Sequence, residues 1–371
     1  MSQDQQPIVL FHPHIPEGGI SALSRTLQTR WIGQGPQVEE FERRFSERFC
    51  RGAPAVAVSS GTSALHLAYL LAGIAEGDEV ITPVFTCTAT NIPLLYERAV
   101  PVFADIQPDT LNIDPASVRA LITERTRAIV CVHYGGFPCD MQELHAIARE
   151  RGIPVIEDAA HALGATYGGE PVGSLSEYTV FSFQAVKHLT TGDGGMLACG
   201  ARQAQLAKRL RWFGIDREAK LGSRWENDIR EIGYKYQMTD IAASLGLAGL
   251  NGWEDCLALR KRLLVEYHEG LRGIPGLQLV GSVADSRREH AAWTCTVLVD
   301  GRADLQRKLR EAGIESDPVH FRNDKYSVFE RYRGQAPNMD AVESRYLVLP
   351  LHTRMSGDDV RRVCNVVRAG W

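Results

Sequence analysis

The chain has 371 residues, a formal net charge of −4 and no basic tail or stripe, so nucleic acid is not expected as a partner. Hydrophobic residues make up 44% and charged residues 23%, as in an ordinary globular protein, and no apolar run approaches the roughly 18 residues of a membrane-spanning helix. The polar segment Met1–Gln6 and the short apolar run Pro7–Phe11 are not typical of a signal peptide, so we expect a cytoplasmic enzyme that binds no membrane.

The eight cysteines are spread over the whole chain and include no Cys-x-x-Cys pair. This spacing fits neither a zinc site nor a disulfide framework. We therefore expect no bound metal, and we expect most of the cysteines to be small buried side chains.

The first predicted elements are two helices, around Ile20–Thr29 and over Gln37–Phe49, with a rigid turn at Trp31–Pro36 between them. The second helix is amphipathic, with charged residues on the face away from the apolar ones. The tryptophan of the turn is expected to anchor a surface.

A small polar loop, Ser59–Ser63, connects a predicted buried strand at Ala55–Val58 to a helix that begins at Ala64. A strand, a loop and a helix in this order form a geometry that binds phosphate, because free N–H groups and the helix dipole point at the anion. The alternative is ordinary capping of the helix by Thr62 or Ser63. The chain contains no Gly-Lys dipeptide, so the loop is not a nucleotide P-loop.

Strands and helices then alternate along the chain, which favours a mainly parallel sheet covered by helices on both faces. In such sheets, ligands bind beyond the carboxyl ends of the strands. Strands are predicted at Glu79–Pro83, Val100–Asp105, Ala128–Val132 and Pro154–Asp158, with helices between them such as Asp140–Arg151.

A carboxylate, Asp158, ends the apolar strand Pro154–Asp158, and two alanines after it leave room for a ligand. A buried carboxylate needs a cationic partner or several hydrogen-bond donors. The alternatives are a structural ion pair and a helix cap. His161 follows closely, although an isolated histidine is more often structural than catalytic.

One lysine, Lys187, lies between a predicted buried strand at Tyr178–Phe183 and the glycine-rich turn Gly192–Gly195. In partly apolar surroundings a lysine can lose its proton and attack a carbonyl group. The alternative is a surface lysine in a loop.

The C-terminal part reads as a separate α+β unit, and we place the boundary so that residues 1–250 form a large domain and residues 251–371 a small one. The further predicted elements are helices at Arg202–Phe213, Ile241–Leu250, Glu254–Leu271, Leu305–Ala312 and Ser356–Val367, and strands at Leu277–Val280 and Trp293–Val299.

Taken together and in this order, the motifs resemble the pyridoxal-phosphate (PLP) aminotransferases of the DegT/DnrJ/EryC1/StrS family, which act on nucleotide-linked keto-sugars. The resemblance implies PLP fold type I: a large domain with a mainly parallel seven-stranded sheet, a smaller α+β domain, and a homodimer with shared active sites. The motifs cover nearly the whole chain, at Trp31–Pro36, Ser60–Thr62, Gly77–Pro83, Glu157–His161, Phe181–Gly195 and Gly233–Asp240.

The family's roles can be assigned to residues of this chain. Lys187 resembles the lysine that forms the Schiff base with the cofactor, and Asp158 resembles the carboxylate that pairs with the pyridine nitrogen. His161 matches a residue that lies against the ring near its phenolic oxygen. The phosphate site corresponds to Gly61, Thr62, Ser63 and Ser182.

Three positions depart from the family pattern. Cys87 replaces the aromatic residue that stacks on the cofactor, and Phe85 lies two positions away from it. Lys235 occupies the place of an asparagine that meets the phosphate bound by the neighbouring subunit. Gln237 replaces an arginine, which argues against an anion-binding role there.

The resemblance implies transfer of the amino group of L-glutamate to a nucleotide-linked 4-keto-6-deoxy or 3-keto sugar by a ping-pong mechanism. His320 and Arg322 match positions near the substrate, where Arg322 would face a diphosphate; the alternative is a surface arginine. The family's dehydratases have histidine at the position of Lys187, so its presence favours transamination, although the next residue is His188. Alternative functions are a cyclitol or other small keto-compound aminotransferase and a non-catalytic regulator that retains the fold.

Overall fold

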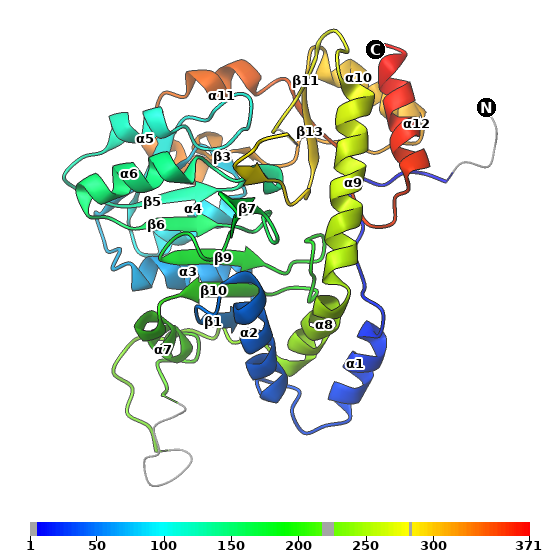
Figure 1. Cartoon of the computed structure of the whole chain (residues 1–371). Coiled ribbons are helices and arrows are strands. Elements are labelled where there is room, and N and C mark those ends of the chain that lie inside the picture. Colours follow the sequence, from blue (N-terminus) through cyan, green and yellow to red (C-terminus); the bar gives the residue numbers. More distant parts are fainter. Residues whose placement is uncertain (1–5, 217–225, 282–283) are drawn as a thin grey trace.

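The large domain is built on a seven-stranded sheet whose strand order is β1-β10-β9-β6-β5-β2-β4 (Figure 1). The computed structural model describes residues 6–216, 226–281 and 284–371. All strands run parallel except β10, which pairs antiparallel with both β1 and β9. The strands are β1 (Ala55–Val58), β2 (Glu79–Pro83), β4 (Val100–Ala104), β5 (Thr126–Val132), β6 (Val155–Asp158), β9 (Tyr178–Ser182) and β10 (Gly195–Cys199).

Helices cover both faces of this sheet, because successive residues of each strand point to opposite sides. In β1, Val56 and Val58 pack against α3 and α7, whereas Ala55 and Ala57 face the cluster formed with α2 and α8. The predicted mainly parallel, two-sided sheet is confirmed. The helices of this domain are α1 (Gly19–Leu27), α2 (Pro36–Phe49), α3 (Gly61–Leu71), α4 (Thr88–Tyr96), α5 (Pro115–Leu121), α6 (Met141–Arg151), α7 (Ala201–Leu210) and α8 (Asp240–Asn251).

The small domain is an antiparallel sheet of order β11-β13-β15 packed against helices. The N-terminal segment joins it, since Ile8 forms a parallel bridge with Ile314. This part contains β11 (Leu277–Leu279), β13 (Cys295–Val299), β15 (Tyr346–Leu349), α9 (Trp253–Leu271), α10 (Arg302–Glu311), α11 (Pro337–Val342) and α12 (Gly357–Arg368).

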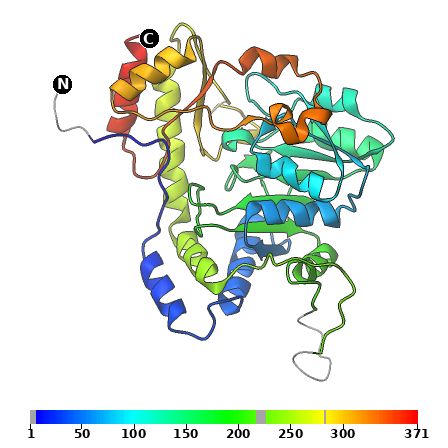
Figure 2. The same ribbon diagram turned by 180° about the vertical axis from the view of Figure 1, so that it is seen from behind.

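Helix α9 runs along one side of the molecule from the end of α8 into the small domain, where it lies beside α12, as Figure 1 and the reverse view in Figure 2 both show. Its first residue, Trp253, packs in the core of the large sheet, whereas Leu263 and Leu264 belong to the core of the small sheet. One continuous helix therefore contributes to both cores, and the domain boundary near residue 250 stays a prediction.

Five short strands form two further small sheets, of order β12-β7-β8 and β14-β3. β14 (Phe321–Arg322) pairs antiparallel with β3 (Phe85–Thr86), which brings a segment of the small domain to the edge of the large one. The other short strands are β7 (Thr166–Tyr167), β8 (Glu170–Pro171) and β12 (Arg288–Glu289). Short 3-10 turns occur at Tyr134–Gly136, Asn323–Lys325 and Ser327–Tyr332.

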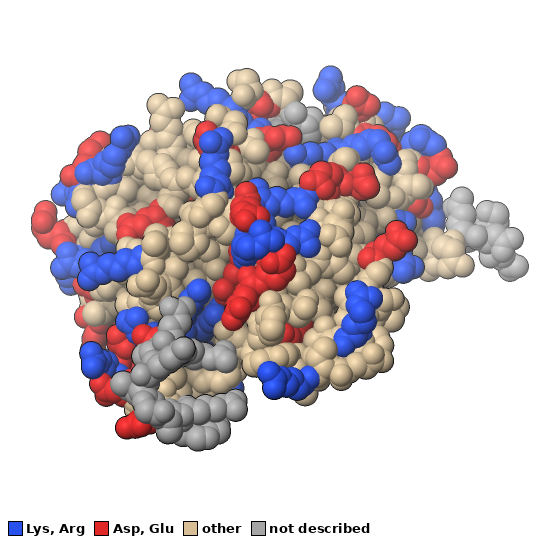
Figure 3. Space-filling model, turned by 60° about the horizontal axis from the view of Figure 1, so that its bottom comes forward, with Lys and Arg blue, Asp and Glu red and all other residues tan. Residues whose placement is uncertain are grey.

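On the face shown in Figure 3, positive and negative side chains are interspersed. None of the helices in the described part of the chain is both long and apolar enough to cross a membrane.

Two predicted boundaries were wrong in ways that matter for the site. The helix expected to begin at Ala64 begins at Gly61, because Ser60 is its N-cap: the Ser60 hydroxyl accepts a hydrogen bond from the Ser63 N–H. Capping by Thr62 or Ser63 was therefore also wrong. The strand expected from Trp293 begins at Cys295, so the tryptophan lies in the preceding loop.

Candidate active site

Lys187 follows β9 and lies against the face of an aromatic ring, with its Nζ atom 3.7 Å from the centroid of Trp293. The side chain is only partly exposed. Burial lowers the pKa of Lys187 to about 8, although the neighbouring Cys87 and Asp158 act in the opposite direction. An amine with this pKa is about half neutral at pH 8, and only a neutral amine is a nucleophile or a base.

Asp158 ends the neighbouring parallel strand β6 and is 3% exposed. Its Oδ2 atom accepts a hydrogen bond from the Thr90 hydroxyl at 2.8 Å, and its Oδ1 atom accepts one from the Ala160 N–H at 3.1 Å. Burial raises the pKa of Asp158, and these hydrogen bonds and the charge of Lys187 partly offset that effect.

The two structural alternatives for Asp158 do not hold. Within residues 6–216, 226–281 and 284–371, no lysine, arginine or histidine forms an ion pair with this carboxylate. The element that directly follows Asp158 is the short strand at Thr166–Tyr167 and not a helix, so Asp158 caps no helix. A buried carboxylate without a cationic partner is costly, so the site is suited to a ligand that carries a positive charge.

Two histidines extend the aromatic wall beside Lys187. The His161 ring stacks on Trp293 with centroids 3.7 Å apart, and the parallel His320 ring lies 5.2 Å from His161. Burial lowers the pKa of His161 well below its usual value and that of His320 to about 3, so both rings are neutral. Their Nε2 atoms are 3.3 Å apart, and His161 Nδ1 is buried without a hydrogen-bond partner in the described structure.

The backbone explains how His320 reaches the site. It immediately precedes β14, which is paired with β3, and its φ of 70° is rare for a residue with a side chain. Its carbonyl accepts a hydrogen bond from Tyr346 of the small sheet. The small domain therefore places this ring against a residue of the large domain.

Trp293 was not among the predicted site residues. The sequence pattern only indicated an aromatic residue at the start of a strand. Its indole N–H donates to the Val186 carbonyl at 3.1 Å, and Phe11 stacks on it at 5.6 Å. No local signal reveals these contacts, because they join three segments that are distant in sequence.

The start of α3 lies beside Ser182, the last residue of β9. A Cβ atom at Gly61 would be 3.0 Å from the Ser182 Cβ atom, and one at Gly195 would be 2.4 Å from the Ser60 carbonyl oxygen. Both glycines are therefore needed for this close approach. The Ser63 hydroxyl lies within hydrogen-bond distance of the Ser59 and Ser60 hydroxyls, at 3.2 and 2.8 Å. The hydroxyls of Ser60, Ser63 and Ser182 thus gather where the positive end of the helix dipole lies.

Comparison with known proteins agrees with this arrangement. Residues 13–368 match the model of the DegT/DnrJ/EryC1/StrS aminotransferase family. The chain belongs to this aminotransferase family.

Three relatives illustrate the similarity. The spore coat polysaccharide biosynthesis protein SpsC of Bacillus subtilis is 37% identical over 376 residues, which cover 96% of this chain and 95% of SpsC. The PLP form of Spr1654 from Streptococcus pneumoniae is 30% identical, with a TM-score of 0.91 and 98% of both chains covered. DesI, whose structure was determined in the presence of its TDP-sugar product, is 30% identical, with a TM-score of 0.87 and 99% and 93% covered.

Membership of the aminotransferase family confirms PLP fold type I and an enzyme of the sugar aminotransferase kind. The roles of the individual site residues stay predictions, and the structure bears on several of them. Cys87 is the N-cap residue of α4 and is partly exposed beside Lys187. It partly opposes the lowering of the Lys187 pKa by burial. Phe85 is 1% exposed between Tyr134 and Tyr346, with ring centroids 5.1 and 4.8 Å away, so it does not face a cofactor.

His188 points away from the site of the aminotransferase. Its Nε2 atom lies 2.8 Å from the Ala291 carbonyl oxygen, and its ring packs against Trp253 in the core. Lys187, not its neighbour, therefore takes the place beside Asp158, which supports transamination over dehydration.

Lys235 is exposed, and its Nζ atom lies 4.3 Å from the centroid of the Trp212 ring. Its role at the neighbouring subunit's cofactor stays a prediction. Gln237 forms a bridge with Val58 at the end of β1, and its side-chain oxygen is buried without a partner in the described structure.

Arg322 does not point to a substrate site as predicted, because its guanidinium group is bound by acidic side chains. The group donates to both oxygens of Asp324 at 2.7 Å and also to Asp340 and Glu343, and the residue is 2% exposed. The hydrogen bonds to Asp324 are the main cause of a raised Arg322 pKa. The predicted contact with a substrate diphosphate is therefore withdrawn, and the alternative of a surface arginine is wrong.

We expect Arg322→Met to lower the free energy of unfolding by about 3 kcal/mol, because it leaves the buried Asp324 carboxylate without its main cation. Chemical denaturation measures this effect. The matched control is Arg307→Met, which removes an exposed arginine paired with Asp304 and should cost less than about 0.5 kcal/mol. Equal losses in the two variants would show that the buried cluster has no special weight.

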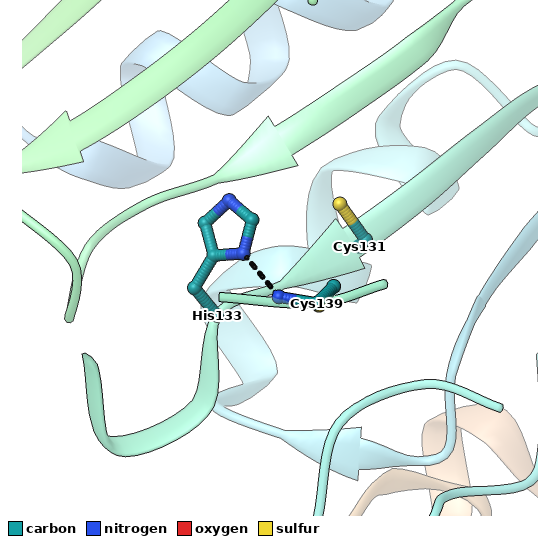
Figure 4. A group of neighbouring side chains, drawn as sticks. All are labelled: Cys131, His133 and Cys139. Carbon is teal, nitrogen blue, oxygen red and sulfur yellow. Dashed lines mark hydrogen bonds between the residues drawn. The ribbon is translucent and has the colours of Figure 1, made fainter. Parts of the chain in front are cut away.

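Three buried residues at and after the end of β5, Cys131, His133 and Cys139, form a separate cluster of possible metal ligands (Figure 4). The three potential ligand atoms lie within 4.8 Å of one another. However, His133 Nδ1 accepts the Cys139 N–H at 3.0 Å, and His133 Nε2 lies 2.8 Å from Glu157. The Cys139 thiol in turn donates to the Val132 carbonyl. The imidazole is thus already engaged on both nitrogens and braces the strand that ends in Asp158.

Proposed function

We propose that the protein is a PLP-dependent aminotransferase that moves the amino group of L-glutamate to a nucleotide-linked keto-deoxysugar. The observation that carries the proposal is the pairing of two groups at adjacent strand ends. Asp158 is a buried carboxylate with which none of the described cations forms an ion pair, and Lys187 is an amine whose pKa is lowered to about 8. A 4-keto-6-deoxy or 3-keto sugar is the acceptor that we propose.

The residues present fit PLP. Lys187 would hold the aldehyde carbon, and Asp158 would receive the protonated ring nitrogen, which supplies the missing positive charge. His161 Nδ1, which lacks a partner in the described structure, would face the phenolic oxygen. The phosphate would lie at Gly61, Thr62, Ser63 and Ser182, where hydroxyls and a helix N-terminus meet.

The proposed mechanism gives each side chain a distinct task. PLP, when bound, supplies an electron sink for the bond that is broken at the substrate Cα atom. The neutral Lys187 amine would remove the proton from the substrate Cα atom and would deliver it to the carbon on the far side of the substrate nitrogen, the 1,3 shift of a transamination. Asp158 keeps the ring nitrogen protonated, because an opposite charge at contact distance shifts a pKa by about 1–3 units. The wall of Trp293, His161 and His320 limits the access of water to the amine.

Two relatives support a nucleotide-sugar acceptor. SpsC is named for polysaccharide biosynthesis, and DesI has a TDP-sugar product. A homodimer with shared active sites, to which Lys235 would contribute, is part of the proposal. The alternatives are a cyclitol or other small keto-compound acceptor and a regulator without activity. Intact Lys187 and Asp158 argue against the regulator.

We expect the purified protein with PLP to absorb light in the imine region and to lose this absorbance when L-glutamate is added. A panel of keto-sugars linked to dTDP, UDP or GDP should then restore it for the true acceptor. Restoration by a cyclitol ketone alone would replace the sugar by the alternative acceptor. A spectrum that glutamate leaves unchanged would contradict the glutamate half-reaction.

A further inference from the structure

A chain of buried hydroxyl groups leads to the Asp158 carboxylate. The Thr90 Oγ1 atom is 2.8 Å from Asp158 Oδ2, and the Thr86 Oγ1 atom is 2.9 Å from Thr90 Oγ1. Thr90 is fully buried and Thr86 is 1% exposed, so water does not compete for these groups. Thr86 ends β3 and Thr90 lies in the first turn of α4, opposite the end of β6.

The direction of this chain follows from the ionised carboxylate. An ionised carboxylate accepts hydrogen bonds and cannot donate them, so the Thr90 hydroxyl must give its proton to Asp158. The Thr90 oxygen then accepts from the Thr86 hydroxyl. The order Thr86 to Thr90 to Asp158 therefore favours the charged form of the carboxylate, whereas burial favours the neutral form.

The backbone around the two threonines is held from several sides. Tyr69 donates its hydroxyl proton to the Thr90 carbonyl at 2.6 Å. The amide nitrogen of Asn323, which follows β14, donates to the Thr86 carbonyl at 2.8 Å. Asn323 in turn accepts from Asn91 at 2.9 Å. The backbone of the two threonines is thus held by α3 and by a segment of the small domain, whereas the Thr90 hydroxyl itself is held by Asp158 and Thr86.

We propose that Thr90, oriented by Thr86, is a positioning residue that keeps Asp158 charged and aimed at the ring nitrogen of the cofactor. The proposal rests on the proposed function and adds a residue for which the family resemblance implies no role. Thr90 acts through Asp158 and touches no reacting atom. Its effect should therefore depend on the presence of a nitrogen in the ring.

The test compares two cofactors on three variants of the apoprotein. One cofactor is PLP and the other is its 1-deaza analogue, in which carbon replaces the ring nitrogen. Thr90→Val keeps the shape of the side chain and removes the hydroxyl, and Thr90→Ser keeps the hydroxyl. Thr82→Val is the matched control, because Thr82 is fully buried and its hydroxyl donates at 2.6 Å to Asn91 and not to Asp158.

We expect Thr90→Val to weaken PLP binding by about ten- to a hundredfold, the range for a hydrogen bond to a charged group. Binding of the deaza analogue should stay unchanged, and Thr90→Ser should restore PLP binding. Thr82→Val should alter neither cofactor, although its thermal midpoint should fall as much as that of Thr90→Val. Dissociation constants come from fluorescence titration.

Other results would overturn the proposal, and they can be told apart. If the wild-type protein does not bind PLP, the proposed function fails and the role of Thr90 fails with it. If wild type binds PLP and Thr90→Val weakens both cofactors equally, or weakens neither, only the role of Thr90 fails. A loss in Thr82→Val equal to that in Thr90→Val would likewise reduce Thr90 to a structural residue.

Discussion

Lys187→Ala should reduce amino transfer by at least about 10⁴-fold, because one side chain supplies both the covalent hold on the cofactor and the proton transfer at the substrate. Borohydride treatment of the wild-type protein with PLP should fix the cofactor to the peptide that contains Lys187. The variant should show no fixed cofactor. Single-turnover absorbance with L-glutamate and mass mapping of the peptides measure the two effects.

Two controls separate the chemistry of the amine from its charge and from lysines in general. Lys187→Arg keeps a cation at the site but cannot lose its proton at neutral pH, so it should be as inactive as the alanine variant. Lys208→Ala removes an exposed lysine of α7 and should leave the rate unchanged. Recovery of the fixed cofactor on a different lysine would contradict the assignment of Lys187.

The large domain was accessible from the sequence because its signals are local. Each parallel strand is a short apolar run with polar residues at or soon after its end. Asp158 is the last residue of β6 and Lys187 follows the end of β9 by five positions, so both could be placed without knowledge of the packing. Alternation of strands and helices then implied a sheet whose carboxyl ends meet. The number of strands followed from the family resemblance and is confirmed.

The parts that were missed depend on contacts between distant segments. Strand β10 (Gly195–Cys199) was not predicted, because its five residues follow directly on the glycine-rich turn and it pairs against the direction of its neighbours. Trp293 comes from a loop of the small domain that meets the large one, and Thr90 comes from a helix start that meets the end of a strand 68 positions further along the chain. Periodicity and composition carry no information about such meetings.

Arg322 shows the opposite error. The position of Arg322 in the family pattern suggested a substrate contact. In the structure its guanidinium group is instead bound by Asp324, Asp340 and Glu343 within the small domain. The acidic residues are visible in the sequence at intervals of 2, 18 and 21 positions, and the intervals of 18 and 21 are too long for a local pattern to couple. A family position therefore predicts proximity to the site better than it predicts where a long side chain points.

Asp158→Asn should lower the rate of the glutamate half-reaction by about ten- to a thousandfold. An amide has no charge to hold the ring nitrogen in its protonated form, and loss of an opposite charge shifts that pKa by about 1–3 units. The electron sink is then weaker at the moment when the Cα proton leaves. Rapid-mixing absorbance with L-glutamate measures the step directly.

The stability of the same variant should change in the other direction. In the apoprotein Asp158 is a buried carboxylate with no cationic partner among the described residues, so its removal should leave the free energy of unfolding equal to or above that of wild type. Glu157→Gln is the contrasting neighbour, because Glu157 points to the other side of β6, where it is bound by His133 and Thr179 at 2.8 and 3.2 Å. That variant should lose stability and keep the ring nitrogen protonated. A carboxylate that costs stability and is still present is best explained by catalysis, so a destabilised Asp158→Asn variant with normal turnover would reverse the assignment.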